Sequence, residues 1–171
     1  MAALWAGAQD ERFAGVISNN SGRMGAALTR PVGEDLARMG GIFPHWFTPG
    51  FLRRVAAGQP LPVDQHQLLA CIAPRALYVT SASEDLHADP EGEFIAWYTA
   101  AAAWEGGAGG AAPSFPEPGQ GRTIEGLPLG YHLRPGEHAV KPFDWEHWLD
   151  FRDRLRSRDR HEQASRTPAN Q

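Results

Sequence analysis

The segment from Leu69 to Pro90 combines the end of a helix, a buried strand and an acidic loop. Pro74 ends the helix, and Ala76–Ser81 has the Leu, Tyr, Val and Thr content of a strand. Asp85 follows shortly after this strand. Open α/β sheets place their chemistry at the C-terminal ends of their strands. The segment therefore predicts an α/β fold with a parallel sheet and a candidate acid.

A second predicted strand ends in a loop that carries a histidine. Leu129–Leu133 breaks at Pro135 and Gly136, and His138 follows. An acid after one strand and a histidine after a later strand is the order of the last two members of the Ser…Asp/Glu…His triad of α/β hydrolases. The serine of that triad stands on a Gly-x-Ser-x-Gly turn, which this sequence lacks. We therefore expect the C-terminal half of a three-layer α/β-hydrolase fold, with the nucleophile half missing.

The other predicted elements alternate between helix and strand, as in parallel βαβ units. Asp64 is expected to cap one helix and Asp89 another, which Pro90 opens. Cys71 is expected to be a buried, inert thiol. The aromatic segment Phe43–Phe47 is expected to fill part of the core, with the wall of a pocket as the alternative. The expected elements are a helix at 2–8, a strand at 13–18, a helix that ends at Pro74, and helices at 91–104 and 143–156.

One domain is expected over residues 1–156. Gly, Ala and Pro dominate residues 106–121, and this composition indicates a flexible loop within the domain. Residues 157–171 are polar, and this indicates a disordered tail.

Charge and composition narrow the classes of partner. The 16 Lys and Arg residues against 20 Asp and Glu residues give a formal net charge of −4, which argues against a nucleic-acid or membrane surface. No apolar run reaches the ~20 residues of a membrane span, and the first ten residues lack the regions of a signal peptide. The seven histidines show neither His-Glu-x-x-His nor Cys/His spacing. We expect no metal, no cofactor, and a small-molecule or polysaccharide partner, with the oligomeric state left open.

Short motifs spread over residues 3–151 carry a family resemblance. They are Ala3–Phe13, Ser18–Gly22, Phe43–Phe47, Leu61–His66, Ile72–Arg75, Glu84-Asp85 with Ala88–Pro90, Gly130–His132 and Asp144–Glu146. Together they resemble the C-terminal part of the glucuronoyl esterase family, α/β hydrolases that cleave esters between lignin alcohols and glucuronic acid on xylan. The resemblance implies a serine carboxylic-ester hydrolase.

In this family the nucleophilic serine stands on a motif similar to Gly-x-Ser-Arg-x-Gly-Lys, just before the stretch that resembles Ala3–Trp5. The resemblance therefore implies that this chain starts a few residues after the nucleophile, with Met1 near the place of the motif's lysine. The chain alone is then expected to be inactive. Full-length relatives are expected to be secreted or periplasmic.

The resemblance also assigns the candidate site residues. His138 matches the catalytic base and Asp85 the acid of bacterial-type members. Other members carry a glutamate at the place of Asn20, whose amide cannot take an ionised role. Glu34 matches a glutamate that binds a sugar hydroxyl, and His87 stands where a tryptophan usually packs against the sugar. Without the resemblance, Asp85 is explained as a loop cap, His138 as an exposed loop histidine and Glu34 as a solvated helix start.

Three functions are compatible with these observations. The first is an esterase of the glucuronoyl type. The second is a non-catalytic α/β-hydrolase remnant that acts as a carbohydrate-binding or interaction module. The third, which the histidine at position 87 keeps open, is an acetyl-xylan-type esterase of the same fold.

Overall fold

The computed structural model describes residues 1–30, 35–107 and 113–166. The chain divides into two compact units, Met1–Ala139 and Val140–Gln171. The first unit contains the sheet and the candidate site residues, and the described part of the second is one helix. Every helix in the described residues is too short or too polar to cross a membrane.

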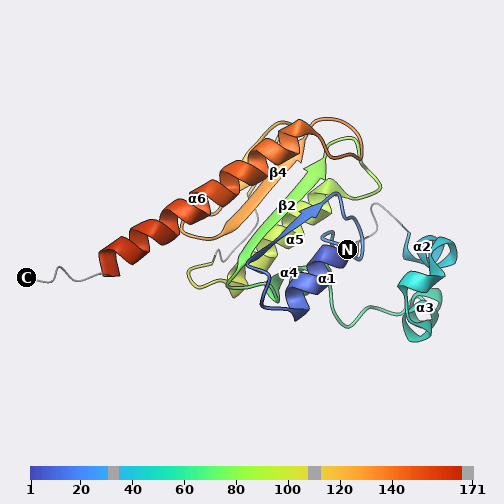
Figure 1. The fold of residues 1–171 in the computed structure, drawn as a ribbon. Helices are drawn as coiled ribbons and strands as arrows, with labels where there is room; N and C mark the ends of the chain where they lie inside the picture. The colour runs from blue at the N-terminus through green and yellow to red at the C-terminus, as the bar shows by residue number, and fades with distance from the viewer. Residues whose placement is uncertain (31–34, 108–112, 167–171) are drawn as a thin grey trace, which may run out of the picture. The chain divides into compact units, whose positions relative to one another are not determined.

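A four-stranded sheet, in the order β1-β2-β4-β3, is the centre of the first unit (Figure 1). The first three strands in this order are parallel, because each is joined to the next by a connection that contains a helix or a long crossover. The short β3 adds to β4 in the antiparallel direction and was not predicted. The α/β class and the three longer strands are confirmed. The strands are β1 (Gly15–Asn19), β2 (Ala76–Ala82), β3 (Gly121–Thr123) and β4 (Leu129–Arg134).

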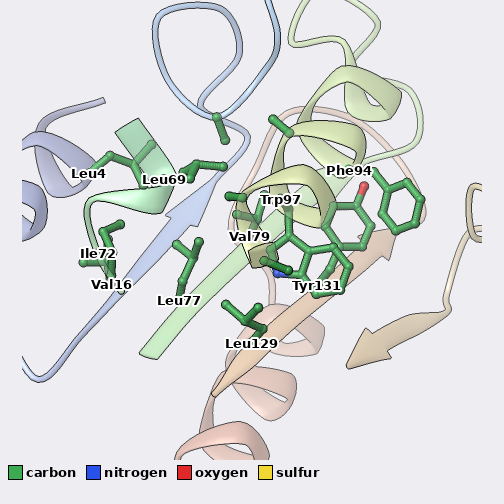
Figure 2. Close-up of a cluster of buried hydrophobic side chains, with 14 of the residues drawn as sticks. Leu4, Val16, Leu69, Ile72, Leu77, Val79, Phe94, Trp97, Leu129 and Tyr131 are labelled. Carbon is green, nitrogen blue, oxygen red and sulfur yellow. The ribbon is translucent and has the colours of Figure 1, made fainter. Parts of the chain in front are cut away.

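Helices α1 (Ala2–Gln9), α4 (Gln65–Ala70) and α5 (Pro90–Ala100) pack with the sheet around one apolar core. Figure 2 shows that side chains of β1, β2 and β4 meet those of the helices in a single layer. A short 3₁₀ turn, η2 (Ala101–Ala103), follows α5 directly. The core residues shown there are Leu4, Val16, Leu69, Ile72, Leu77, Val79, Phe94, Trp97, Leu129 and Tyr131.

Both predicted helix caps are confirmed. Asp64 forms a capping box with Gln67 at the start of α4. The Asp89 carboxylate accepts a hydrogen bond from the Gly92 N–H at 3.1 Å at the start of α5. Each cap satisfies a backbone donor that the first helical turn leaves without an intrahelical partner. These short helices therefore begin where the sequence placed them.

The aromatic segment Phe43–Phe47 does not fill the core, and this expectation was wrong. It lies in a helical excursion that consists of α2 (Leu36–Ile42), η1 (Pro44–Trp46) and α3 (Pro49–Ala56). The Phe43 and Trp46 rings stack on each other with centroids 4.3 Å apart, and Trp46 is 47% exposed. In the described residues, the rings of Phe43, Trp46 and Phe47 are not part of the apolar core cluster, and Phe43 and Trp46 pack on each other instead.

The expected burial of Cys71 was also wrong, because the thiol is exposed. Cys71 lies at the C-terminal cap of α4, and its Sγ donates to the Gln67 carbonyl at 3.3 Å. Successive helical residues are rotated by about 100°. Leu69 and Ile72 therefore face the core, whereas the Cys71 side chain points to solvent.

Helix α6 (Pro142–Arg166) extends well beyond Arg156, where the sequence placed its end. The disordered tail expected from residue 157 is therefore wrong for residues 157–166, and residues 167–171 lie outside the described residues. After Pro142 the next Gly or Pro is Pro168, so no helix breaker interrupts this polar stretch. Its start at Pro142 is one residue before the expected start, and Asp144 in the first turn accepts a hydrogen bond from the Lys141 N–H at 2.7 Å.

Candidate active site

Asp85 and His138 meet at the C-terminal edge of two neighbouring parallel strands. Ala82 of β2 is opposite Arg134 of β4, so both strands end at the same level. The pairing continues into the loops, because the Ser83 N–H donates to the Arg134 carbonyl at 2.9 Å. A few residues beyond each strand end, the Oδ2 atom of Asp85 lies 2.6 Å from Nδ1 of His138. The common level of the two strand ends therefore brings the acid and the histidine into contact.

The two partners differ sharply in exposure. The Asp85 side chain is 9% exposed and the His138 side chain 68%. A carboxylate that accepts a hydrogen bond from a protonated Nδ1 fixes the tautomer of the imidazole and leaves Nε2 as the basic nitrogen. The arrangement therefore presents an oriented proton acceptor at the surface, with its orienting acid beneath. This is the chemistry required of a general base and its supporting acid.

The loop that carries His138 follows a tight path through Gly136. This glycine has φ +100°, a region that residues with a side chain rarely adopt. Its N–H donates to Ser83 Oγ at 3.2 Å, and its carbonyl accepts from the Glu84 N–H at 3.0 Å. Hydrogen bonds between Gly136 and the two residues before Asp85 thus join the acidic loop to the histidine loop.

Arg134, the last residue of β4, binds the backbone of the same loop. Its side chain is 3% exposed, and the guanidinium donates to the carbonyls of Pro135, Glu137 and Ala139 at 2.9, 2.5 and 3.2 Å. These carbonyls lie on both sides of His138 in the sequence. The arginine therefore fixes the loop before and after the histidine.

The turn after β1 reaches the histidine loop but not the imidazole. Asn19 and Asn20 donate their side-chain amides to the Ala139 carbonyl at 3.2 and 3.1 Å. Asn20 has φ +43°, a left-handed conformation that asparagine tolerates better than most residues. At the position where some family members carry an acid, this chain supplies a hydrogen-bond donor to the backbone.

Beneath these loops, Glu93 of α5 is fully buried and accepts four hydrogen bonds. Its Oε1 accepts from Ser21 N–H, Ser21 Oγ and Gly22 N–H at 2.8, 3.2 and 3.0 Å, and its Oε2 accepts from Ser81 Oγ at 2.6 Å. Burial raises the pKa of Glu93 to about 7, while these hydrogen bonds oppose the rise. The residue links the turn after β1, strand β2 and helix α5.

The acidic loop ends at a second charged group. Asp89 is buried, has φ +54°, and pairs with Arg30 through contacts of 2.7 and 2.9 Å. Arg30 also contacts Glu91 at 2.7 Å, and these carboxylates raise the pKa of the guanidinium. This network connects the segment after β1 to the end of the Asp85 loop.

The predicted site residues thus have different outcomes. Asp85 and His138 come together, and His87 is exposed two residues after Asp85 in the same loop. Glu34 lies outside the described residues. Sequence reasoning missed Arg134 and Glu93; the signals were an arginine at the end of an apolar strand and a glutamate between apolar residues of a helix. No group of three metal-ligating side chains comes together in the described ranges.

A sequence model of the family described as glucuronyl esterase, fungi, matches residues 1–107. The chain belongs to the glucuronyl esterase family. A relative named carbohydrate esterase MZ0003, from an unknown prokaryotic organism, is 46% identical over 153 residues, which is 88% of this chain and 35% of the relative.

Solved structures of the family agree with this assignment. A promiscuous CE15 esterase from a marine bacterial metagenome superposes with a TM-score of 0.78 at 45% identity, over 88% of this chain and 38% of that chain. The glucuronoyl esterase from Solibacter usitatus superposes with a TM-score of 0.77 at 40% identity, with the same coverage. This chain therefore has an α/β-hydrolase-type fold and spans little more than a third of the length of these relatives.

Proposed function

We propose that this chain supplies the acid and the base of a glucuronoyl esterase, which cleaves esters between glucuronic acid on xylan and lignin alcohols. The observation that supports this most directly is the 2.6 Å contact between Asp85 Oδ2 and His138 Nδ1 at the edge of the sheet. Family membership supports a carbohydrate esterase, and the exposed imidazole supports a role in proton transfer to a substrate.

The reaction requires a serine from the portion of the family fold that this sequence does not span. In the proposed mechanism, the serine oxygen attacks the ester carbonyl while Nε2 of His138 takes the serine proton. The tetrahedral intermediate then breaks the bond to the alcohol, and His138 returns the proton to the departing oxygen. Water then attacks the acyl-enzyme while His138 takes a proton from the water, and His138 returns the proton to the serine oxygen as the acid product leaves. Throughout, Asp85 keeps Nδ1 protonated and stabilises the imidazolium.

A chimera tests this proposal. The segment of the 46%-identical relative that precedes its matching region is joined to this chain, and hydrolysis of a benzyl ester of glucuronic acid is measured. We expect turnover that a serine-directed phosphonate blocks and that His138→Ala abolishes. The chain of 171 residues alone is the matched control, and we expect no hydrolysis above background, because it lacks a serine elbow.

The same assay separates the alternatives. Turnover of acetylated xylan in place of the glucuronate ester would identify an acetyl-xylan-type esterase. A folded but inactive chimera, together with binding of xylan oligosaccharides by the chain alone, would identify a non-catalytic carbohydrate-binding module and overturn the proposal.

A further inference from the structure

We propose that Arg134, Asn19 and Asn20 form a carbonyl clamp whose function is to position His138 for its contact with Asp85. The proposal deepens the proposed function and rests on it. The three residues are positioning residues, since they contact the backbone of the histidine loop and not the imidazole.

The first argument is convergence on one acceptor. Donors from all three side chains meet at the carbonyl oxygen of Ala139, at 3.2 Å from Asn19, 3.1 Å from Asn20 and 3.2 Å from Arg134. A carbonyl has two lone pairs, so three donors saturate it. Ala139 directly follows His138, and its peptide plane is therefore fixed from two different strand ends, those of β1 and β4.

The second argument is the spacing of the arginine contacts. Arg134 donates to the carbonyls of residues 135, 137 and 139, which alternate along the loop and enclose His138. A guanidinium has five donors in a rigid plane, so one side chain can bind several acceptors in a fixed geometry. With both neighbouring carbonyls held, the remaining freedom of His138 is confined to its own side-chain torsions.

The third argument is the exposure of the histidine. His138 is 68% exposed, so packing does little to orient its ring. Arg134 and Asn20 are 3% and 5% exposed, and their hydrogen bonds are sheltered from competing water. Site geometry requires supporting residues whose own positions are locked. For an exposed catalytic base, buried donors to its backbone provide that support.

Histidine tautomers in the chain as it exists provide the test. In ¹⁵N-labelled protein at about pH 8.5, where an ordinary imidazole is neutral, the ring nitrogen shifts of His138 report whether Nδ1 or Nε2 carries the proton. We expect the Nδ1-protonated form in the wild type. Arg134→Lys keeps the charge but removes the fork, and Asn20→Asp replaces the donor with an acceptor. Both variants should lose the Nδ1-protonated signal and show broadened amides in residues 136–139.

The chain offers a matched control and an internal reporter. Arg122 of β3 donates to the Gly121 carbonyl and to the Gln120 side chain, so Arg122→Lys changes an arginine outside the clamp and should leave the His138 signal as in the wild type. His132 is fully buried, with Nδ1 3.0 Å from Tyr78 Oη, and its ring signals report that the sheet is intact. Tautomers are compared only among variants that keep the His132 signals.

The outcomes separate the clamp from the pair that it supports. Asp85→Asn should remove the Nδ1-protonated form; an unchanged tautomer in that variant would contradict the proposed function itself. If Asp85→Asn changes the tautomer but Arg134→Lys and Asn20→Asp do not, the clamp is refuted and the acid–base pair stands. If Arg134→Lys loses the His132 signals, the test uses Asn20→Asp and Asn19→Ala instead. Loss of the Nδ1-protonated form in these two variants supports the clamp, and an unchanged tautomer refutes it.

Discussion

Ser81 of β2 donates its hydroxyl to Oε2 of Glu93 at 2.6 Å, inside the core and directly beneath the strand end that leads to Asp85. This contact and the three that reach Oε1 explain how a fully buried carboxyl is retained in a helix of apolar residues. They also make the fold sensitive to the protonation of that carboxyl.

Glu93 is expected to make stability fall as pH rises from about 4.5 to about 7. In this window the folded state binds the Glu93 proton and the unfolded state does not, so raising the pH favours unfolding. Glu93→Gln does not titrate and should lack this component. Urea unfolding of both proteins across this pH window measures it. Parallel stability curves for the two proteins would show that Glu93 does not titrate as described.

Asp85→Asn in the chimera is expected to lower kcat far more than Asn20→Ala. An ionised carboxylate holds the tautomer and stabilises the imidazolium, an effect of about 10⁴ for the corresponding change in serine proteases. Asn20→Ala removes one of three donors to Ala139 and leaves the carboxylate in place. Both rates are measured on one ester at one pH. Equal, mild losses would place the acid elsewhere, with Glu84 and Asp89 tested next.

Arg30→Met is expected to destabilise the fold more than Glu91→Gln. Without Arg30 the buried Asp89 carboxylate loses its ionic partner, whereas Glu91 is 54% exposed and its pairing contributes little. Because Arg30 is itself partly exposed, we expect a cost of about 1–3 kcal/mol, which is below that of a fully buried pair. Denaturant unfolding measures both variants. A larger loss in Glu91→Gln would contradict this order.

Gly136→Ala is expected to destabilise the histidine loop, and Gly50→Ala is its control. An added Cβ at Gly136 has no contact closer than 3.5 Å, so the cost of about 1 kcal/mol or more comes from φ +100°. Gly50 lies in α3 with a nearest contact of 4.0 Å, and alanine there should stabilise the helix. Thermal unfolding and the His138 ring signals report both effects. Unchanged signals in Gly136→Ala would show that the loop accommodates the side chain.

Self-association of the isolated chain is expected through β1, an edge of the described sheet. Ile17 in this strand is 42% exposed, and an apolar edge strand is a template for pairing with another chain. Ile17→Lys should reduce association, since a lysine on an edge opposes pairing. Sedimentation velocity over a concentration series measures the change. A wild type that stays monomeric with a cooperative thermal transition would contradict the prediction.

Sequence alone predicted that Asp85 and His138 lie at one edge of the sheet, because both follow strands with clear composition and parallel strands end at a common edge. It could not locate the clamp, because the partners of Arg134 are backbone carbonyls whose positions depend on the path of the loop. The error at Cys71 has a similar origin. An apolar run specifies that a helix is buried, but the rotation of each residue about the helix axis decides which side chain remains outside.

The pairing of Ala82 with Arg134 limits which changes of length β2, β4 and their loops can accept. Each residue added to a strand shifts the adjoining loop by about 3.3 Å and reverses the face on which its side chains lie. This displacement is larger than the 2.6 Å between Asp85 Oδ2 and His138 Nδ1. Insertions and deletions should therefore be absent from residues 76–85 and 129–138 in active relatives. Engineering should keep these two strand-and-loop segments at constant length, and between η2 and β3 it should keep Trp104 and Phe115, which pack in the apolar core.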